Sequence, residues 1–220
     1  DAVVEQASSL YQTALRAGAF TCYVLDFSPS MRGDGRSQLL SAMKILLDQT
    51  LASGYNLQAS PKDTWCVVLF SDVVLAEYYR EGNDAATLYQ ETDIGSYVET
   101  SLYGQIFYQD FGSGTNVYGS TLRGLEIVSG NARPDQLRAV ILLTDGQSNV
   151  GPNEREFKRD YPKYGGVPVY AIGMGDASEY TLTEIAKITG GTYCDGRSGE
   201  EALARCFRQF NTMAEAKKNP

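Results

Sequence analysis

Short apolar runs alternate with longer amphipathic segments along this chain. The apolar runs are almost continuous, and each ends at polar or turn-forming residues: 20–25, 65–70, 139–144 and 167–172. Runs of this length without alternation are typical of parallel strands that are covered on both faces. Residues 73–79 alternate weakly after a Ser71-Asp72 turn and predict an edge strand that pairs antiparallel to its predecessor. Residues 192–194 predict a last short strand.

The segments between these strands carry apolar residues at helical spacing. The helices that they predict cover residues 2–17, 36–51, 117–129, 154–161, 180–189 and 200–216. Gly18, Gly130 and Gly190 stand where helices of this set end. Strand and helix therefore alternate, which predicts a doubly wound α/β fold with helices on both faces of a mainly parallel central sheet. We expect about six strands, with one antiparallel strand at the edge.

Chain length and segment boundaries predict one domain. A chain of 220 residues can bury a substantial core without disulfide or metal support. We expect an N-terminal helix in residues 1–18, a domain over residues 19–216 and a frayed tail at residues 217–220. Residues 82–112 form a long Tyr-rich connection, in which we expect a helix at residues 93–102. Connections of this length tend to be functional or mobile, and an ordinary packed excursion fits the sequence equally well.

Charge and composition exclude several kinds of function. The chain has 19 Lys and Arg against 27 Asp and Glu, a net charge of -8, which argues against a nucleic-acid groove or an anionic membrane surface as partner. His is absent, which removes the commonest general base, the Ser-His-Asp arrangement and most zinc sites. No apolar run approaches the roughly 20 residues that span a bilayer. The chain begins at Asp1 without a Met or a visible signal peptide, so we expect an excised domain or a mature product.

The four cysteines fall into two groups. Cys22 and Cys66 lie inside apolar runs, so we expect buried thiols. Cys194 ends the last predicted strand and Cys206 lies on the helix after it. A disulfide between these two is compatible with their placement, but the sequence does not fix the geometry. Spacing typical of metal ligands, such as C-x-x-C, is absent, and the redox compartment stays open.

Oxygen-bearing side chains follow two of the predicted strands and open one of the helices. Asp26, Ser28 and Ser30 lie in the turn directly after the first apolar run, Thr115 opens the helix that follows the long connection, and Asp145 comes directly after the third apolar run. In open α/β sheets, ligands bind at the carboxyl ends of the strands, beside the switch point. Oxygen donors without Cys or His suit a hard cation such as Mg2+.

An ordinary structural role competes with this interpretation of the first turn. Asp and Ser are common in turns and at helix N-caps, so Ser30 or Asp34 would simply cap the helix that begins near Arg36. The turn alone does not decide between the two roles. Arg32-Gly33-Asp34 also spells a tripeptide that some adhesion receptors recognise, but three residues arise by chance often, and this loop needs a Gly.

Taken together, these segments resemble the von Willebrand factor type A (vWA) domain over about residues 20–212. The metal-ion-dependent adhesion site of that family is written D-x-S-x-S, then T, then D after a buried strand, and this sequence supplies each member in order, in matching Gly-Thr-Asn and Leu-Thr-Asp-Gly contexts. The resemblance implies an intact site in which the hydroxyls of Ser28, Ser30 and Thr115 ligate the ion directly. The two aspartates then act directly or through bound water. The implied ion is Mg2+, with Mn2+ or Ca2+ as alternatives, and a Glu or Asp of a partner protein completes its shell.

The resemblance implies a non-enzymatic, divalent-cation-dependent protein-binding or adhesion module. The alternative is an assembly or docking module of a larger multi-subunit complex that uses the same metal site. An enzyme is disfavoured, because aspartyl phosphotransferases of doubly wound fold need a second Asp where this chain has Ser28. The leading helix resembles that of bacterial extracytoplasmic proteins which join a solute-binding region to a vWA domain, and this implies an extracytoplasmic or cell-surface location. In some relatives the last helix shifts as the ion shell changes, and the sequence leaves this open for residues 200–216.

Overall fold

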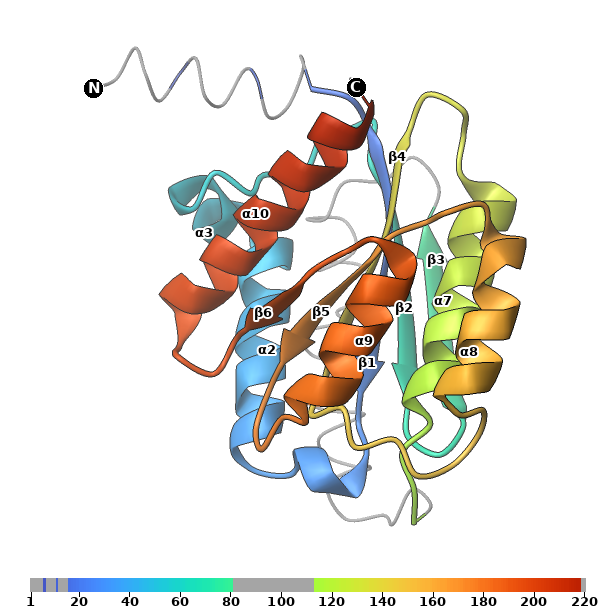
Figure 1. The fold of residues 1–220 in the computed structure, drawn as a ribbon. Helices are drawn as coiled ribbons and strands as arrows, with labels where there is room; N and C mark the ends of the chain where they lie inside the picture. Colours follow the sequence, from blue (N-terminus) through green and yellow to red (C-terminus); the bar gives the residue numbers. More distant parts are fainter. Residues whose placement is uncertain (1–5, 7–10, 12–15, 81–112, 219–220) are drawn as a thin grey trace.

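The computed structural model describes Gln6, Tyr11 and residues 16–80 and 113–218 (Figure 1). The expected N-terminal helix lies almost entirely outside the described residues, and so does the whole Tyr-rich connection with its expected helix. Within the described residues, no helix is both long and apolar enough to cross a membrane.

A six-stranded sheet forms the centre of the molecule, in the order β3-β2-β1-β4-β5-β6. Its strands are β1 (Ala19–Asp26), β2 (Thr64–Phe70), β3 (Val74–Arg80), β4 (Leu137–Thr144), β5 (Val169–Gly173) and β6 (Tyr193–Asp195). β3 runs antiparallel to β2, and the other neighbouring strands are parallel. The predicted fold class, a mainly parallel α/β sheet with one antiparallel edge strand, is therefore confirmed.

The order of the strands creates a switch point between β1 and β4. From β1 the sheet grows outward to β2 and β3, and the chain then returns to the other side of β1 to form β4, β5 and β6. The connections that leave β1 and β4 run to opposite faces of the sheet, and in open α/β sheets ligands bind at the carboxyl ends of such a strand pair. Asp26 is the last residue of β1, and Asp145 directly follows β4.

Helices cover both faces of the sheet (Figure 1). They are the 3-10 helices η2 (Pro29–Met31) and η4 (Tyr161–Tyr164) and the α-helices α2 (Asp34–Leu47), α3 (Gln49–Gly54), α7 (Val117–Asn131), α8 (Glu154–Asp160), α9 (Glu179–Thr189) and α10 (Glu200–Lys218). α2 and α10 share one hydrophobic core with Tyr23 and Leu25 of β1, whereas α7 and α9 share the other with Cys22 and Val24. Successive residues of β1 thus point to opposite faces, and both faces are buried. α10 continues to Lys218, past its expected end.

Asp48 divides the helix predicted at residues 36–51 into two. α2 begins earlier than predicted and ends at Leu47, where Asp48 adopts an extended backbone with a ψ of 104°. Oδ1 of Asp48 accepts hydrogen bonds from the backbone N of Thr50 (2.9 Å) and Leu51 (3.2 Å) and so caps α3. Asp is among the strongest N-cap residues, but the apolar periodicity continues through this position and concealed the break.

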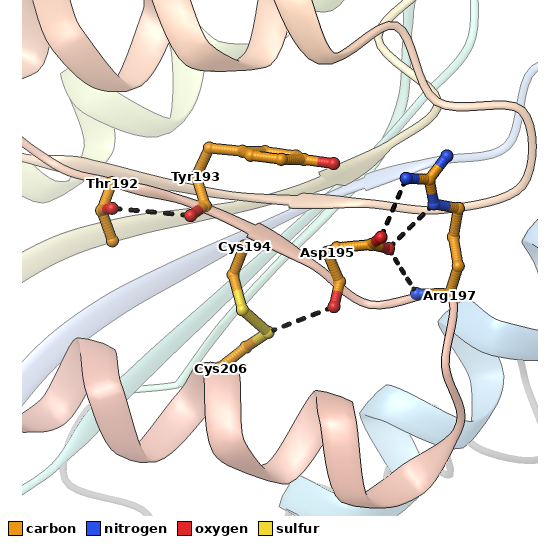
Figure 2. The surroundings of a disulfide bond; sticks show 6 residues. All are labelled: Thr192, Tyr193, Cys194, Asp195, Arg197 and Cys206. Atoms are coloured by element: carbon orange, nitrogen blue, oxygen red, sulfur yellow. Dashed lines mark hydrogen bonds and ion pairs between the residues drawn. A yellow bond between two sulfur atoms is a disulfide. The ribbon is translucent and has the colours of Figure 1, made fainter.

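The cysteines behave in two ways. Cys22 and Cys66 are buried free thiols, as predicted, and they oppose each other in register on β1 and β2. Cys194 and Cys206 form a disulfide between β6 and α10, with their Cα atoms 5.8 Å apart (Figure 2). The pairing that the sequence left open is therefore made, because the short edge strand and the last helix pack against each other.

Candidate metal centre

The carboxylate of Asp26 is buried at the end of β1 and held from two sides. Its Oδ1 accepts a hydrogen bond from the backbone N of Ser28 at 2.8 Å, and its Oδ2 accepts one from the hydroxyl of Thr144 at the end of β4. The Thr144 hydroxyl oxygen in turn accepts a bond from the backbone N of Gly146 at 2.9 Å. The carboxylate is thus fixed in one orientation, and it joins the loops that follow β1 and β4.

The turn η2 brings two hydroxyls together directly after Asp26. Ser28 is buried, Ser30 is exposed, and their Oγ atoms lie 3.0 Å apart. Adjacent ligands of an octahedral Mg2+, each at about 2.1 Å from the ion, lie about 3.0 Å from each other. Arg36 fixes this turn from α2, because its buried Nη2 donates to the carbonyls of Phe27 (3.0 Å) and Ser28 (3.5 Å). The two hydroxyl oxygens therefore have the separation that one shared ion requires.

The competing role in helix capping is wrong for these residues. The N-cap of α2 is Gly33, which has a φ of +80° and receives no side-chain cap bond. Asp34 is the first residue of the helix, and Ser30 lies in η2, where its hydroxyl contacts that of Ser28. The oxygens of the turn are thus not engaged in starting the helix.

Thr115 lies just before α7, in a loop that is clamped to the loop after β4. Its backbone N donates to Oδ1 of Asn149 at 2.7 Å, and its carbonyl accepts from the backbone N of Asn149 (3.0 Å) and from the hydroxyl of Ser148 (3.3 Å). The hydroxyl of Ser71, just after β2, donates to the carbonyl of Gly114 at 3.2 Å and ties the same loop to the sheet. The hydrogen bonds of Thr115 to described residues use its backbone, so its hydroxyl is available as a ligand.

Asp145 supplies a buried oxygen without a partner. Its Oδ1 accepts a hydrogen bond from the backbone N of Gln147 at 3.2 Å, whereas its Oδ2 is buried and has no hydrogen-bond partner among the described residues. Burying a carboxylate oxygen in this way is unfavourable unless a cation or a donor compensates it. An oxygen of this kind suits a metal ligand.

The electrostatics of the site also favour a cation. Burial raises the pKa of Asp26 to about 7, hydrogen bonds from Ser28 and Thr144 oppose this rise, and the charge of Asp145 adds to it. A divalent ion here would stabilise both ionised carboxylates and supply a Lewis acid that binds an external carboxylate. The residues that would hold it are Asp26, Ser28, Ser30, Thr115 and Asp145. The described residues include no group of three or more His, Cys, Asp or Glu side chains placed for a metal, so this shell would rely on hydroxyls and water.

Several residues that support the site were not predicted from the sequence. Thr144 orients Asp26, Asn149 clamps the Thr115 loop, and Arg36 fixes the turn η2. Thr144 and Asn149 lie close to Asp145 in the sequence, and this closeness to a candidate ligand could have marked them as residues that support the site. Nothing local marks Arg36 as buried, because a basic residue in the first turns of a helix is usually exposed.

A comparison with known families identifies the fold. Residues 22–204 match the family model of the von Willebrand factor type A domain. This chain belongs to the vWA family. vWA domains are typically metal-dependent adhesion or protein-interaction modules and are generally not enzymes. No curated protein matches the chain.

Solved vWA structures resemble this domain at low sequence identity. BatB, a conserved hypothetical protein from Bacteroides thetaiotaomicron, has a TM-score of 0.61 and 16% identity over 90% of this chain and 99% of its own. An aerotolerance-related membrane protein from Bacteroides fragilis has a TM-score of 0.57 and 15% identity over 87% of this chain and 100% of its own. The manganese-loaded TRAP protein of Plasmodium vivax has a TM-score of 0.57 and 17% identity over 87% of this chain and 74% of its own. At these identities the likeness supports the fold alone.

Proposed function

We propose that this vWA domain is a non-enzymatic, divalent-cation-dependent protein-binding or adhesion module. The hydroxyls of Ser28, Ser30 and Thr115 hold the cation together with Asp26 and Asp145, and an acidic residue of a partner protein completes the shell. The observation that carries the proposal is the buried Oδ2 of Asp145, which has no partner among the described residues although burial of such an oxygen is unfavourable.

The donor set favours Mg2+. All five side chains offer oxygen, and the 3.0 Å between the two serine hydroxyls suits a small octahedral ion. Mn2+ and Ca2+ accept the same kinds of donor. Among the structural relatives, the TRAP protein is manganese-loaded, and proximal thread matrix protein 1 of the mussel byssus has a zinc-occupied MIDAS motif.

An acidic side chain is the partner group that such a site selects. Neutral hydroxyl ligands leave much of the charge of the ion uncompensated, and an external carboxylate then makes a charge-assisted contact. Ser30 is exposed, so the ion is accessible from outside. The net charge of -8 does not oppose this contact, because the ion sets the local field. A docking role inside a larger complex would use the same contacts.

An extracytoplasmic or cell-surface location agrees with the covalent structure. Disulfides persist in oxidising compartments, and Cys194 is bonded to Cys206. Structural relatives include a membrane protein from Bacteroides fragilis and the pilus adhesin SpaC of Lactobacillus rhamnosus. We place the domain at residues 19–216, preceded by a helix in residues 1–18, in a bacterial extracytoplasmic protein.

Calorimetric titration tests the metal site. Mg2+, Mn2+ and Ca2+ are added to the wild type, Thr115→Ala and Asp145→Asn in acetate buffer, whose carboxylate stands in for that of a partner. We expect saturable binding by the wild type and its loss in both variants. Asp135→Asn removes one charge from the turn before β4, at the amino end of that strand and thus at the end of the sheet away from the metal site. This variant is expected to bind the ions as the wild type does. A wild type that binds none of the three ions overturns the proposal.

A further inference from the structure

A polar cavity of about 330 Å3 lies beside the candidate metal site. Its walls come from the start of α2 and from the loops after β5 and β6, and Ser30 lines it on the side of the metal site. Arg32, Asp34, Asp176 and Arg197 are the charged side chains in its lining. Because Ser30 belongs to both the cavity and the candidate ion shell, a peptide bound to the ion reaches the cavity with a nearby residue.

The walls of the cavity are held in place without a ligand. The backbone N of Gly175, in the loop after β5, donates to Oε1 of Gln38 on α2 at 2.9 Å. Gly175 has a φ of +51°, and a Cβ at this position would lie 3.4 Å from the Cα of Gly35, so the two backbones are in contact. A ligand therefore does not have to order these walls when it binds.

Arg197 lies in the loop that the Cys194–Cys206 disulfide closes (Figure 2), and it lines the cavity. Its Nε and Nη2 each donate to the carboxylate of Asp195 at 2.8 Å, and Nη2 also donates to Glu179 at 2.9 Å. Two carboxylates thus balance one guanidinium group. Arg197 therefore brings rigidity to the cavity but no net positive charge.

Asp34 and Asp176 differ from Arg197 in having no such partner. Both are exposed, and neither side chain forms a hydrogen bond or an ion pair with any described residue. The lining contains two arginines and two aspartates, but Arg197 is already bound by Asp195 and Glu179, which lie outside the lining. Negative groups therefore outnumber positive ones in and around the cavity. When the acidic residue of the partner completes the metal shell, its carboxylate and the two aspartates of the site together offset the charge of the ion. The unpaired aspartates therefore favour a basic side chain over an acidic one in this cavity.

We propose that this cavity binds a Lys or Arg side chain of the same segment whose acidic residue completes the metal shell. The inference rests on the proposed function and narrows the partner to a segment with an acidic and a basic residue close together. Asp34 and Asp176 supply the attraction, and the balanced Arg197 does not oppose it. An exposed charge pair of this kind changes affinity by about two- to five-fold.

Immobilised synthetic peptides test the inference directly. Each peptide carries one central Glu with Lys, Ala or Glu at a flanking position, and protein binding is measured in Mg2+ and in EDTA. We expect Lys beside Glu to strengthen Mg2+-dependent binding by the wild type. Asp34→Asn and Asp176→Asn are each expected to weaken binding of the Lys peptides by about two- to five-fold and to leave the Ala peptides unchanged. Asp135→Asn is the matched control and keeps the preference for Lys.

The outcomes separate this inference from the proposed function. Mg2+-dependent binding of Glu peptides without a preference for Lys overturns the inference alone, and so does a preference for a second Glu. A Lys preference that persists in EDTA or in both cavity variants places the basic residue elsewhere and also overturns it. Absence of Mg2+-dependent binding to every Glu peptide overturns the proposed function and the inference with it.

Discussion

Thr144 offers a stringent test of how the metal site is held together, because one hydroxyl serves two buried groups. It donates to Oδ2 of Asp26 and accepts from the backbone N of Gly146, and the Thr144 side chain is fully buried. Thr144→Val keeps the shape of the side chain and removes both hydrogen bonds. Each buried polar group that is left without its hydrogen-bond partner lowers the stability of the protein by about 1–3 kcal/mol. Because two groups lose their partner, we expect the free energy of unfolding to fall by about 2–4 kcal/mol in the absence of a divalent ion.

The same change is expected to weaken ion binding. Thr144 does not belong to the proposed shell, but it orients Asp26, which does. Loss of a partner that orients a metal ligand lowers metal affinity by about 10–100-fold. Urea unfolding in EDTA measures the stability, and calorimetric titration with Mg2+ measures the affinity.

Thr121→Val is the matched control. Thr121 is also a fully buried threonine, and its hydroxyl donates to the carbonyl of Val117 at 2.8 Å inside α7. That carbonyl keeps its ordinary helical hydrogen bond in the variant, so we expect a loss below about 1 kcal/mol and an unchanged Mg2+ affinity. If Thr144→Val and Thr121→Val behave alike in both assays, Thr144 does not orient the site and the reasoning is refuted.

Three further predictions concern the disulfide, the ionisation of Asp26 and the buried side chain of Arg36. Cys194→Ala/Cys206→Ala opens a loop with a sequence separation of 12 and lowers the free energy of unfolding by about 3 kcal/mol in thermal unfolding; a variant as stable as the wild type contradicts this. Because burial raises the pKa of Asp26 to about 7, the native protein holds a proton that the unfolded chain releases, so stability in EDTA falls as the pH rises from about 4 to 7. Asp26→Asn flattens this dependence, and parallel urea-unfolding profiles of the two proteins would argue against it. Arg36→Met removes the donor that fixes the turn η2, so we expect the Mg2+ affinity measured by calorimetry to fall about ten-fold. An unchanged affinity would show that the turn keeps its shape without this donor.

The main parts of this fold could be predicted because they depend on local patterns. β1 and β4 each read as continuous apolar runs, since both of their faces are buried, and that pattern is visible in one strand at a time. The parallel arrangement then places Asp26 and Asp145 at the same edge of the sheet without any knowledge of side-chain contacts. The candidate ligands were therefore accessible from the sequence.

Contacts between distant segments could not be predicted in this way. The bond between Thr144 and Asp26 depends on the register of β4 against β1, which no local pattern specifies. The break at Asp48 was hidden because a capping side chain and an apolar period occupied the same stretch. The disulfide depended on how α10 packs against β6, and the charge of the cavity on which carboxylates reach Arg197.

The disulfide also determines how the domain carries mechanical force. Tension applied on the carboxyl side of Cys206 passes along α10 to this residue and then divides between the backbone and the covalent link to Cys194 on β6. The sulfur bridge is the shorter path, so residues 195–205 bear little of the load. A pull that unwinds the end of α10 would therefore leave the loop that carries Arg197 unloaded and in place.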